Sequence, residues 1–387
     1  MDKRGIRDLI AGAALLLFLG ILYVWSKFAA PVAEFLEWDL TAVKLTANFM
    51  LCCFVVGIML GGLLFGKMKA KWIALAGGLL LAGGIFAASF TPKNAPWLIY
   101  ITYGICGGTG VGMAYNTVLS CAQKWFPKRR SLAVGVSVFF FGFSTVVLAP
   151  LIVMLTETVG VANSFRVLAG LIAGATVALH RMICEPDQVE QSASGGSGGA
   201  VSLTFAQALK SRNLYLLFVY MVFGNSVYLI ANPSFQTMAE NRGIGDLGTT
   251  MLMISGIANA IGRVSVPLLI TKLGSRYAAM ITSLATALAA FALCFVQGVW
   301  LIPVVAVIAY FFGGYSAIAP VIASDYFGLK HIAPIFGAVM CGYMVSALIF
   351  PVILGSSGDT VRFITTGAAA AVSIVLLALL PKKTLQH

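Results

Sequence analysis

The stretch "GLLFGKMKAK", residues 62–71, ends a long apolar run with a turn and a group of lysines. The same arrangement returns 205 residues later as "PLLITKLGSR", residues 267–276, where an apolar run again ends in basic residues and a glycine. Further matches occur at a constant offset of 201 residues, namely Gly112 with Gly313, Phe126 with Phe327 and Pro150 with Pro351. The recurrence predicts two parallel repeats, each filling about half of the chain.

The apolar runs predict an integral membrane protein. Hydrophobic residues make up 60% of the chain and charged residues only 10%, whereas soluble domains are about 25% charged. Each run of about 20 apolar residues is long enough to cross a hydrocarbon core of about 30 Å as a helix. We predict twelve spans, at residues 8–30, 42–65, 71–90, 96–122, 131–156, 163–184, 212–239, 247–271, 276–297, 299–323, 334–355 and 361–380. The expected architecture is an all-α transporter of twelve transmembrane helices in two pseudo-symmetric six-helix bundles, with its site between the halves.

One long polar stretch divides the chain near its middle. It reads "EPDQVEQSASGGSGGAVSLTFAQALKSRN", residues 185–213, and its Gly/Ser centre is typical of a flexible linker. We therefore expect an N-terminal six-helix bundle over 1–184, a cytoplasmic linker over 185–211 and a C-terminal six-helix bundle over 212–387.

The net charge of +12 follows membrane topology. With a cytoplasmic N-terminus, 18 of the 25 lysines and arginines fall in inner loops and tails, 6 fall outside, and Arg263 remains inside a span. This bias fits the positive-inside rule with both termini cytoplasmic. The start "MDKRGIRD" leads into a retained helix rather than a cleaved signal peptide. We interpret the basic run "KWFPKRR", residues 124–130, as an inner loop and expect no nucleic-acid partner.

The chain shows none of the residue patterns that enzymes or metal proteins use. The seven cysteines lie within or at the ends of spans without metal-ligand or disulfide spacing. The string "GGTGVG", residues 107–112, has no preceding strand, so it indicates close helix packing rather than a phosphate loop. The three histidines are too scattered for a metal site or a proton relay, and no nucleophile with a base lies within a span. We expect neither catalysis nor a cofactor.

Arg263, in the stretch "NAIGRVSVPLL" (259–269), is the most informative residue. No other charged side chain lies between Leu247 and Ile270, and an arginine at the centre of a span costs about 2.5 to 3.5 kcal/mol. Lys272 marks the inner end nine residues away, roughly 13 Å along a helix, which is too far for comfortable snorkelling. No Asp or Glu lies in the middle of a predicted span. The charge therefore predicts an anionic ligand or a water-filled cavity, and the alternative is a structural arginine bonded to carbonyls or tyrosines.

Other polar groups of the spans complete the candidate site. Guanidinium binds a carboxylate through two parallel charge-assisted hydrogen bonds. Asn259, one turn before Arg263, could steady the guanidinium through its amide oxygen, or could simply be packed. Buried tyrosines need hydrogen-bond partners and can wall a cavity, and each could equally bond a neighbouring carbonyl. The candidates are Tyr23, Tyr115 with Asn116, Tyr310, Tyr315 and Tyr343. We interpret the string "VFFFGFS", residues 138–144, as packing and lipid contact.

Three stretches resemble the oxalate/formate antiporter family of the major facilitator superfamily. They are "GILYVWSKF" (20–28), "AYNTVLSCAQKWFPKRRSLAVGVSVFFFGFSTVVLAPL" (114–151) and "SDYFGLKHIAPIFG" (324–337). The resemblance implies the major facilitator fold, with Arg263 at the family's substrate-binding arginine, and it favours Tyr315 and Tyr343 among the tyrosines. Two departures matter. Gly66 and Thr271 replace the usual loop aspartates, and Tyr343 stands where the oxalate carrier has a lysine.

The predicted function is exchange of small carboxylates by alternating access, with formate, acetate or lactate favoured over oxalate. A dianion would place its second charge against the neutral Tyr343. The alternatives are a proton-coupled monocarboxylate symporter and a transport-inactive sensor on the same fold. The expected partners are small carboxylate anions and the lipid bilayer, and we expect a monomer.

Overall fold

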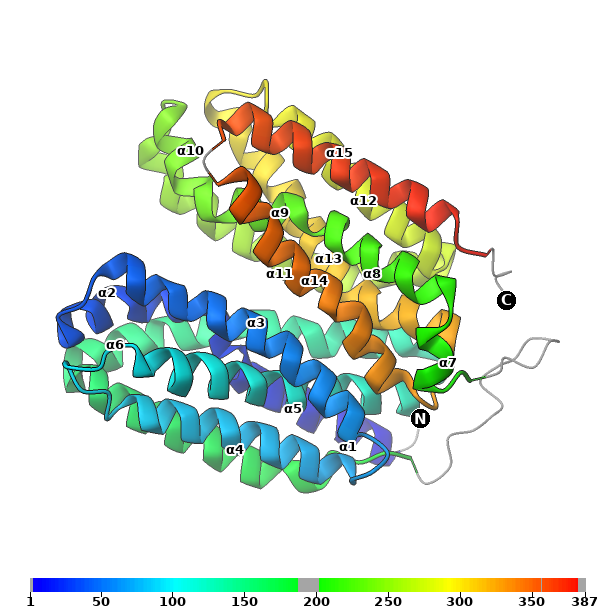
Figure 1. Ribbon diagram of the computed structural model, residues 1–387, viewed down its shortest axis with the longest axis horizontal. Helices are drawn as coiled ribbons and strands as arrows, with labels where there is room; N and C mark the ends of the chain where they lie inside the picture. The colour runs from blue at the N-terminus through cyan, green and yellow to red at the C-terminus, as the bar shows by residue number, and fades with distance from the viewer. Residues whose placement is uncertain (1–2, 187–201, 356, 382–387) are drawn as a thin grey trace. The chain divides into compact units, whose positions relative to one another are not determined.

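The computed structural model describes residues 3–186, 202–355 and 357–381 (Figure 1). Every regular element in these ranges is a helix, as the apolar runs predict. Most of the predicted linker, residues 187–201, lies outside the described residues, as does the C-terminal tail from residue 382.

The described residues form two compact units. Unit 1 draws on Met1–Lys128, Phe140–Gln191 and Leu329–Gly337, and unit 2 on Arg129–Phe139, Ser192–Gly328 and Ala338–His387. Unit 2 thus includes the first turns of the long helix α6, and unit 1 includes the beginning of α14. The domain boundaries at 184 and 212 stay a prediction.

Unit 1 is built mainly from the helices of the first half. Their bounds are α1 (Lys3–Leu19), α2 (Trp25–Leu36), α3 (Leu40–Leu64), α4 (Ala70–Ala88), a π-helical segment (Tyr100–Gly107), α5 (Gly108–Trp125) and α6 (Arg130–Leu179). A 3-10 turn, His180–Met182, follows α6. Buried glycines and alanines on α3, α4 and α5 let these helices pack closely.

Unit 2 is built mainly from the second half. Its helices are α7 (Phe205–Leu209), α8 (Arg212–Gly224), α9 (Ser226–Ala231), α10 (Phe235–Asn241), α11 (Gly248–Leu273), α12 (Ser275–Ala292), α13 (Leu301–Phe327), α14 (Ile332–Leu354) and α15 (Asp359–Ala378). Thr204 caps α7 in a reciprocal arrangement with Gln207, so a short helix with a defined start lies within the predicted linker.

The helices account for the predicted spans. Nine helical stretches of the described residues are each long and apolar enough to cross a membrane. One of them, Pro127–Met182, covers two predicted spans, because Gly160 breaks the helical path with a φ of 77°. The remaining two spans are 96–122, which joins the π-helical segment to α5, and 276–297, which is built on the 18 residues of α12. The nine stretches thus correspond to ten predicted spans, and these two regions bring the number to twelve.

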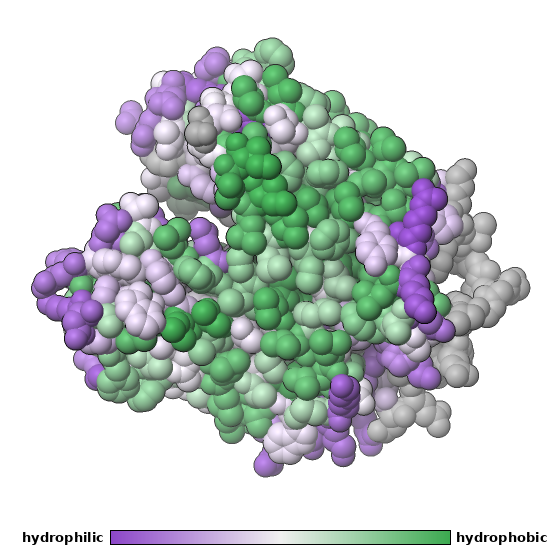
Figure 2. Space-filling view, viewed as in Figure 1, coloured by the Kyte–Doolittle hydropathy of each residue, from purple (hydrophilic) through white to green (hydrophobic). Residues whose placement is uncertain are grey.

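The surface is that of a membrane protein. Large apolar side chains are exposed along the helices; Phe295 and Val352, for example, are 82% and 81% exposed. Figure 2 shows hydrophobic residues covering the sides of the helices, with hydrophilic residues gathered toward their ends. An extended apolar surface of this kind is stable in contact with lipid but not in contact with water.

The internal repeat recurs in the way the helices cross. In unit 1 a Cβ on Gly57 would lie 2.2 Å from the Thr109 carbonyl oxygen, and one on Gly112 would lie 2.0 Å from that of Phe54. In unit 2 the corresponding values are 1.9 Å between Gly262 and Tyr310 and 2.1 Å between Gly313 and Asn259. The residues pair at the same offsets, 205 for α3 with α11 and 201 for α5 with α13. The two halves therefore repeat one crossing, and Arg263 occupies the counterpart of Ile58.

This crossing gives a first prediction, on stability. Replacing Gly262 by alanine should lower the thermal unfolding midpoint of the purified protein, since overpacking against the Tyr310 carbonyl costs about 1 to 3 kcal/mol. The matched control is Gly256→Ala on the same helix, where no atom lies within 4 Å of the added Cβ. There alanine should be neutral or slightly stabilising. Equal unfolding midpoints for Gly262→Ala and Gly256→Ala would contradict the close crossing of α11 and α13 at Gly262.

Candidate functional site

Arg263 lies in the middle of α11 and is 2% exposed. Two features of the helix pair place it. Gly313 of α13 leaves room for its aliphatic stem, because a Cβ there would lie 3.3 Å from the arginine Cγ. Pro267, one turn later, has no N–H to donate to the Arg263 carbonyl, which loosens the helix at this turn.

The guanidinium has protein acceptors in this structure. Its Nε donates to Asn259 Oδ1 at 2.8 Å, and Nη1 donates to the main-chain carbonyl of Val138 at 3.0 Å. The expectation that only water or a ligand would satisfy the charge is therefore wrong for these two N–H groups. The alternative that the sequence left open, bonding to a carbonyl, is present. Both acceptors are neutral, so neither neutralises the charge.

Asn259 occupies the position that the sequence predicts. It is 9% exposed and contacts the guanidinium through its amide oxygen. The predicted steadying contact is confirmed, whereas a role in substrate binding stays a prediction.

The first turns of α6 meet α11 at Arg263. A Cβ on Gly135 would lie 2.9 Å from Pro267 Cγ and 3.0 Å from the Arg263 carbonyl oxygen, so the two helices approach backbone to side chain. Val138, one turn later and fully buried, offers its carbonyl to Nη1. The arginine thus holds the beginning of α6 against α11.

The predicted tyrosines of unit 2 fall into different surroundings. Tyr315 is 1% exposed, shares a 2.7 Å hydrogen bond with Ser283 and stacks on Tyr220 at 5.5 Å between ring centroids. Its hydroxyl therefore already has a protein partner. Tyr310 accepts a hydrogen bond from Ser265. Tyr343 is half-buried, and its ring lies 6.5 Å from that of Phe312. A substrate contact of any of these three tyrosines stays a prediction.

Unit 1 gathers two of its candidates around one phenylalanine. The rings of Tyr23 and Tyr115 lie 5.2 Å and 4.9 Å from that of Phe141, and Phe54 contacts both Tyr115 and Phe141. Asn116 is separate from this aromatic group. Its Nδ2 donates to the carbonyls of Ile58 and Ala333, at 2.7 Å and 2.9 Å, which joins α5, α3 and the beginning of α14. These contacts favour a structural role for Asn116.

Both units interrupt their first membrane helix at matching positions. In unit 1 the chain leaves the α-helix at Gly20–Tyr23, and Val24 has a φ of −106°. In unit 2 the break falls at Asn225, between α8 and α9, which is 201 residues after Val24. Interrupted helices at corresponding positions of two repeats are typical of transporter sites. Tyr23 lies directly at such a break.

Sequence reasoning missed three parts of this arrangement. Phe141 belongs to the string that the sequence assigns to packing and lipid contact; it is 1% exposed and packed, but its place between the rings of Tyr23 and Tyr115 was not predicted. Asn225 was not singled out, and the string "GNS" at 224–226 inside an apolar run is the signal that could have indicated it. The Val138 carbonyl left no signal, because every residue carries the same main-chain group.

A buried guanidinium of this kind is chemically able to bind an anion. A buried guanidinium with neutral acceptors binds an incoming carboxylate more strongly than it binds an amide or peptide oxygen, because two charge-assisted bonds form at once. The described residues hold no group of three or more metal-ligating side chains.

Comparison with known proteins agrees with this description. The family model of the Major Facilitator Superfamily matches residues 10–351. Monocarboxylate transporter 12-B of Danio rerio is 23% identical over 364 residues, 84% of this chain and 76% of the relative. The oxalate:formate antiporter of Oxalobacter formigenes is 31% identical over 162 residues, 41% of this chain and 37% of the relative.

The fold is shared with a solved transporter. The crystal structure of the Escherichia coli fucose:proton symporter superposes with a TM-score of 0.75 at 12% identity, covering 98% of this chain and 100% of the symporter. The family match covers most of the chain, so it indicates a transporter rather than an enzyme. The chain belongs to the Major Facilitator Superfamily.

Proposed function

We propose that the protein exchanges small monocarboxylates across the membrane by alternating access, with Arg263 binding the carboxylate. The observation that carries the proposal is a guanidinium, 2% exposed, whose Nε and Nη1 donate to neutral oxygens. The names of two relatives, an oxalate:formate antiporter and a monocarboxylate transporter, support the same substrate class.

Binding would proceed as a replacement of one acceptor by another. A substrate carboxylate takes Nη1 from the Val138 carbonyl, while Asn259 keeps Nε and holds the plane of the guanidinium. Because a carboxylate carries a full charge, the new bonds are shorter and roughly twice as strong as the bond to a peptide oxygen. The substrate also releases the first turns of α6 from Arg263, which links binding to movement of α6.

Exchange follows from the charge of the two states. A loaded carrier rearranges with a neutral guanidinium–carboxylate pair, whereas an empty carrier has to move the guanidinium through a site of low dielectric constant without the carboxylate of the substrate. The empty movement is therefore slower. The Val138 carbonyl partly compensates the guanidinium in the empty carrier and so reduces the difference between the two barriers without removing it. Net flux should therefore be slow rather than absent.

Counterflow in proteoliposomes tests the proposal. Vesicles preloaded with formate, acetate or lactate should take up labelled monocarboxylate at least about tenfold faster than empty vesicles, a ratio that corresponds to about 1.4 kcal/mol between the two barriers. Equal uptake rates in loaded and empty vesicles, with stoichiometric proton entry, would show that the protein is a proton-coupled symporter and not an exchanger. The absence of any uptake, with substrate binding retained, would favour a transport-inactive sensor.

Tyr343 gives a second prediction, on substrate choice. We propose that its half-buried phenol stands near the second end of the bound anion. Tyr343→Lys should shift the ratio of oxalate to formate uptake toward oxalate by about tenfold, because an ammonium compensates a buried second charge far better than a neutral hydroxyl does. Tyr343→Phe is the matched control, and it should leave the ratio within about threefold. An unchanged ratio in Tyr343→Lys would remove Tyr343 from the site.

Topology and assembly complete the proposal. The bias of basic residues supports a cytoplasmic (inner) membrane location with both termini cytoplasmic. We also propose that the chain works as a monomer, with bundles at 1–184 and 212–387 joined by a cytoplasmic linker. Accessibility of cysteines introduced at Lys67 and at Lys93 to an impermeant reagent tests the orientation, since the two positions should label from opposite sides.

A further inference from the structure

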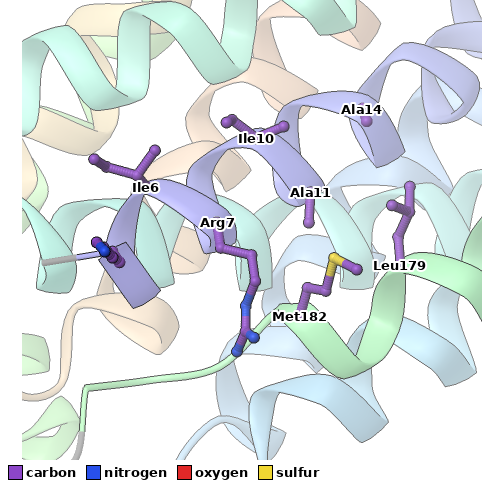
Figure 3. Close-up of a pocket in the computed structure, with 8 residues that line it drawn as sticks. Ile6, Arg7, Ile10, Ala11, Ala14, Leu179 and Met182 are labelled. Carbon is purple, nitrogen blue, oxygen red and sulfur yellow. The ribbon is translucent and has the colours of Figure 1, made fainter.

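A hollow on unit 1 differs in chemistry from the Arg263 site. It has a volume of about 280 Å³ and is lined by Lys3, Ile6, Arg7, Ile10, Ala11 and Ala14 of α1 and by Leu179 and Met182 at the end of α6 and its 3-10 turn. Figure 3 shows Arg7 and Ala11 on the side of α1 that faces Met182. We propose that this groove binds one anionic phospholipid, with the phosphate at Lys3 and Arg7 and an acyl chain along the apolar residues.

The shape of the groove follows from the size of its side chains. Ala11 and Ala14 are small, so the surface between Ile10 and the pair Leu179 and Met182 is hollow rather than filled. Ile10 is 65% exposed and Met182 39% exposed, which leaves two apolar walls without a protein neighbour over much of their surface. A flexible hydrocarbon chain fits such a groove. Moving the chain from the surrounding lipid into the groove costs little free energy, because both environments are apolar.

Basic side chains at one end of the groove supply the specificity for an anionic headgroup. Lys3 and Arg7 stand one turn apart on α1, and both are exposed. Arg181, also exposed, is next to Met182 in the 3-10 turn. By the proposed topology this end of α1 lies at the cytoplasmic face, where anionic headgroups attract basic residues.

Two acidic side chains of the described residues near the groove have protein partners of their own. Asp8 follows Arg7 in the sequence, but it is 2% exposed and accepts a 2.8 Å hydrogen bond from the Cys184 amide. Glu185 is bonded to Lys124 at 2.6 Å. Arg7 interacts electrostatically with the buried Asp8, but within the described part of the chain neither Lys3 nor Arg7 forms an ion pair within 4 Å, and both side chains are exposed and can face a phosphate.

A second hollow is lined by apolar residues alone and serves as a comparison for the groove on unit 1. It lies on unit 2, has a volume of about 430 Å³ and is lined by Ala285, Leu288, Ala289, Ala292, Pro303, Val304 and Val307. All of these residues are apolar, so this surface can contact hydrocarbon but cannot choose a headgroup. Only the groove on unit 1, of these two, joins an apolar channel to basic side chains.

Lipid titration of the purified, delipidated full chain tests the proposal. We expect native mass spectrometry to show phosphatidylglycerol bound at least about tenfold more tightly than phosphatidylcholine, in keeping with two basic contacts near the membrane surface. The double variant K3Q/R7Q should lose this preference. The matched control K67Q/K69Q, which removes two exposed inner charges elsewhere, should keep it.

Two further arms separate the groove from simple surface charge and from a soluble ligand. Ala14→Phe fills the channel without changing charge, and it should weaken phosphatidylglycerol binding about fivefold or more. Glycerol 3-phosphate, a headgroup without chains, should not compete. The proposal is overturned if the two lipids bind equally, if K67Q/K69Q weakens binding as much as K3Q/R7Q, if Ala14→Phe has no effect, or if glycerol 3-phosphate displaces the lipid.

Discussion

Replacing Arg263 by lysine is expected to lower counterflow at low substrate concentration by about 100-fold or more, although the positive charge is kept. Lysine cannot form the two parallel bonds of the guanidinium fork, and it also loses the contact with Asn259 Oδ1. A hydrogen bond to a charged group contributes about 1.5 to 3 kcal/mol, so two of them correspond to at least about 3 kcal/mol. The measurement is the initial rate of labelled formate or lactate uptake into preloaded proteoliposomes.

The control for this variant is an arginine of unit 1. Arg166 donates to Ser89 and Asn163 and lies over the ring of Phe90, away from the proposed chemistry. Arg166→Lys should keep uptake within about threefold of the parent protein. If Arg263→Lys exchanged formate as fast as Arg166→Lys, the bidentate role of the guanidinium would be wrong.

Replacing Asn259 by aspartate is expected to make substrate binding strongly dependent on pH. The change is nearly isosteric, yet it places a carboxylate 2.8 Å from the Arg263 Nε, where it competes with the substrate. The substrate can then bind only when the new carboxyl takes up a proton. Above the pKa of that carboxyl, each binding event consumes one proton, so apparent affinity should rise about tenfold for each unit by which pH falls from 8 to 6. The parent protein should show no such slope.

Asn259→Ala separates the effect of the added carboxylate charge from the effect of losing the hydrogen bond to Arg263. It removes the bond to Nε without adding a carboxylate, so binding should weaken by about threefold to tenfold at every pH. Titration calorimetry or substrate-dependent thermal shift at three pH values checks both variants. A flat pH profile for Asn259→Asp would show that the substrate carboxylate does not bind the guanidinium that residue 259 contacts.

The fold could be predicted from the sequence because membrane helices are decided by length and composition. The repeat was also readable, since Gly112 and Gly313 mark the same crossing in the two halves. Details that depend on backbone geometry were not readable. The π-helical form of Tyr100–Gly107 and the merging of two spans through Gly160 are examples, because apolar composition is the same in a straight and an irregular helix.

The residues of the candidate site could be predicted from the sequence, but their hydrogen-bond partners mostly could not. Arg263 and Asn259 were found because a charge in a span is costly and a residue four positions earlier lies on the same face. Tyr315 illustrates the limit. It lies on the same helix as Gly313, but which of its neighbours bonds the phenol depends on the packing of α12 beside α13, and Ser283 supplies that partner. The Val138 carbonyl depends on a contact between residues 125 positions apart, which no local pattern encodes.

The central claim is that the guanidinium of Arg263 is the group that binds the cargo carboxylate. Thermal unfolding of the purified protein across a panel of carboxylates, with the parent chain beside Arg263→Ala, tests it most directly. Millimolar formate, acetate or lactate should raise the midpoint of the parent and leave that of Arg263→Ala unchanged, since a ligand stabilises only the state that binds it. Equal stabilisation of both proteins, or a parent that no carboxylate stabilises, would contradict the account.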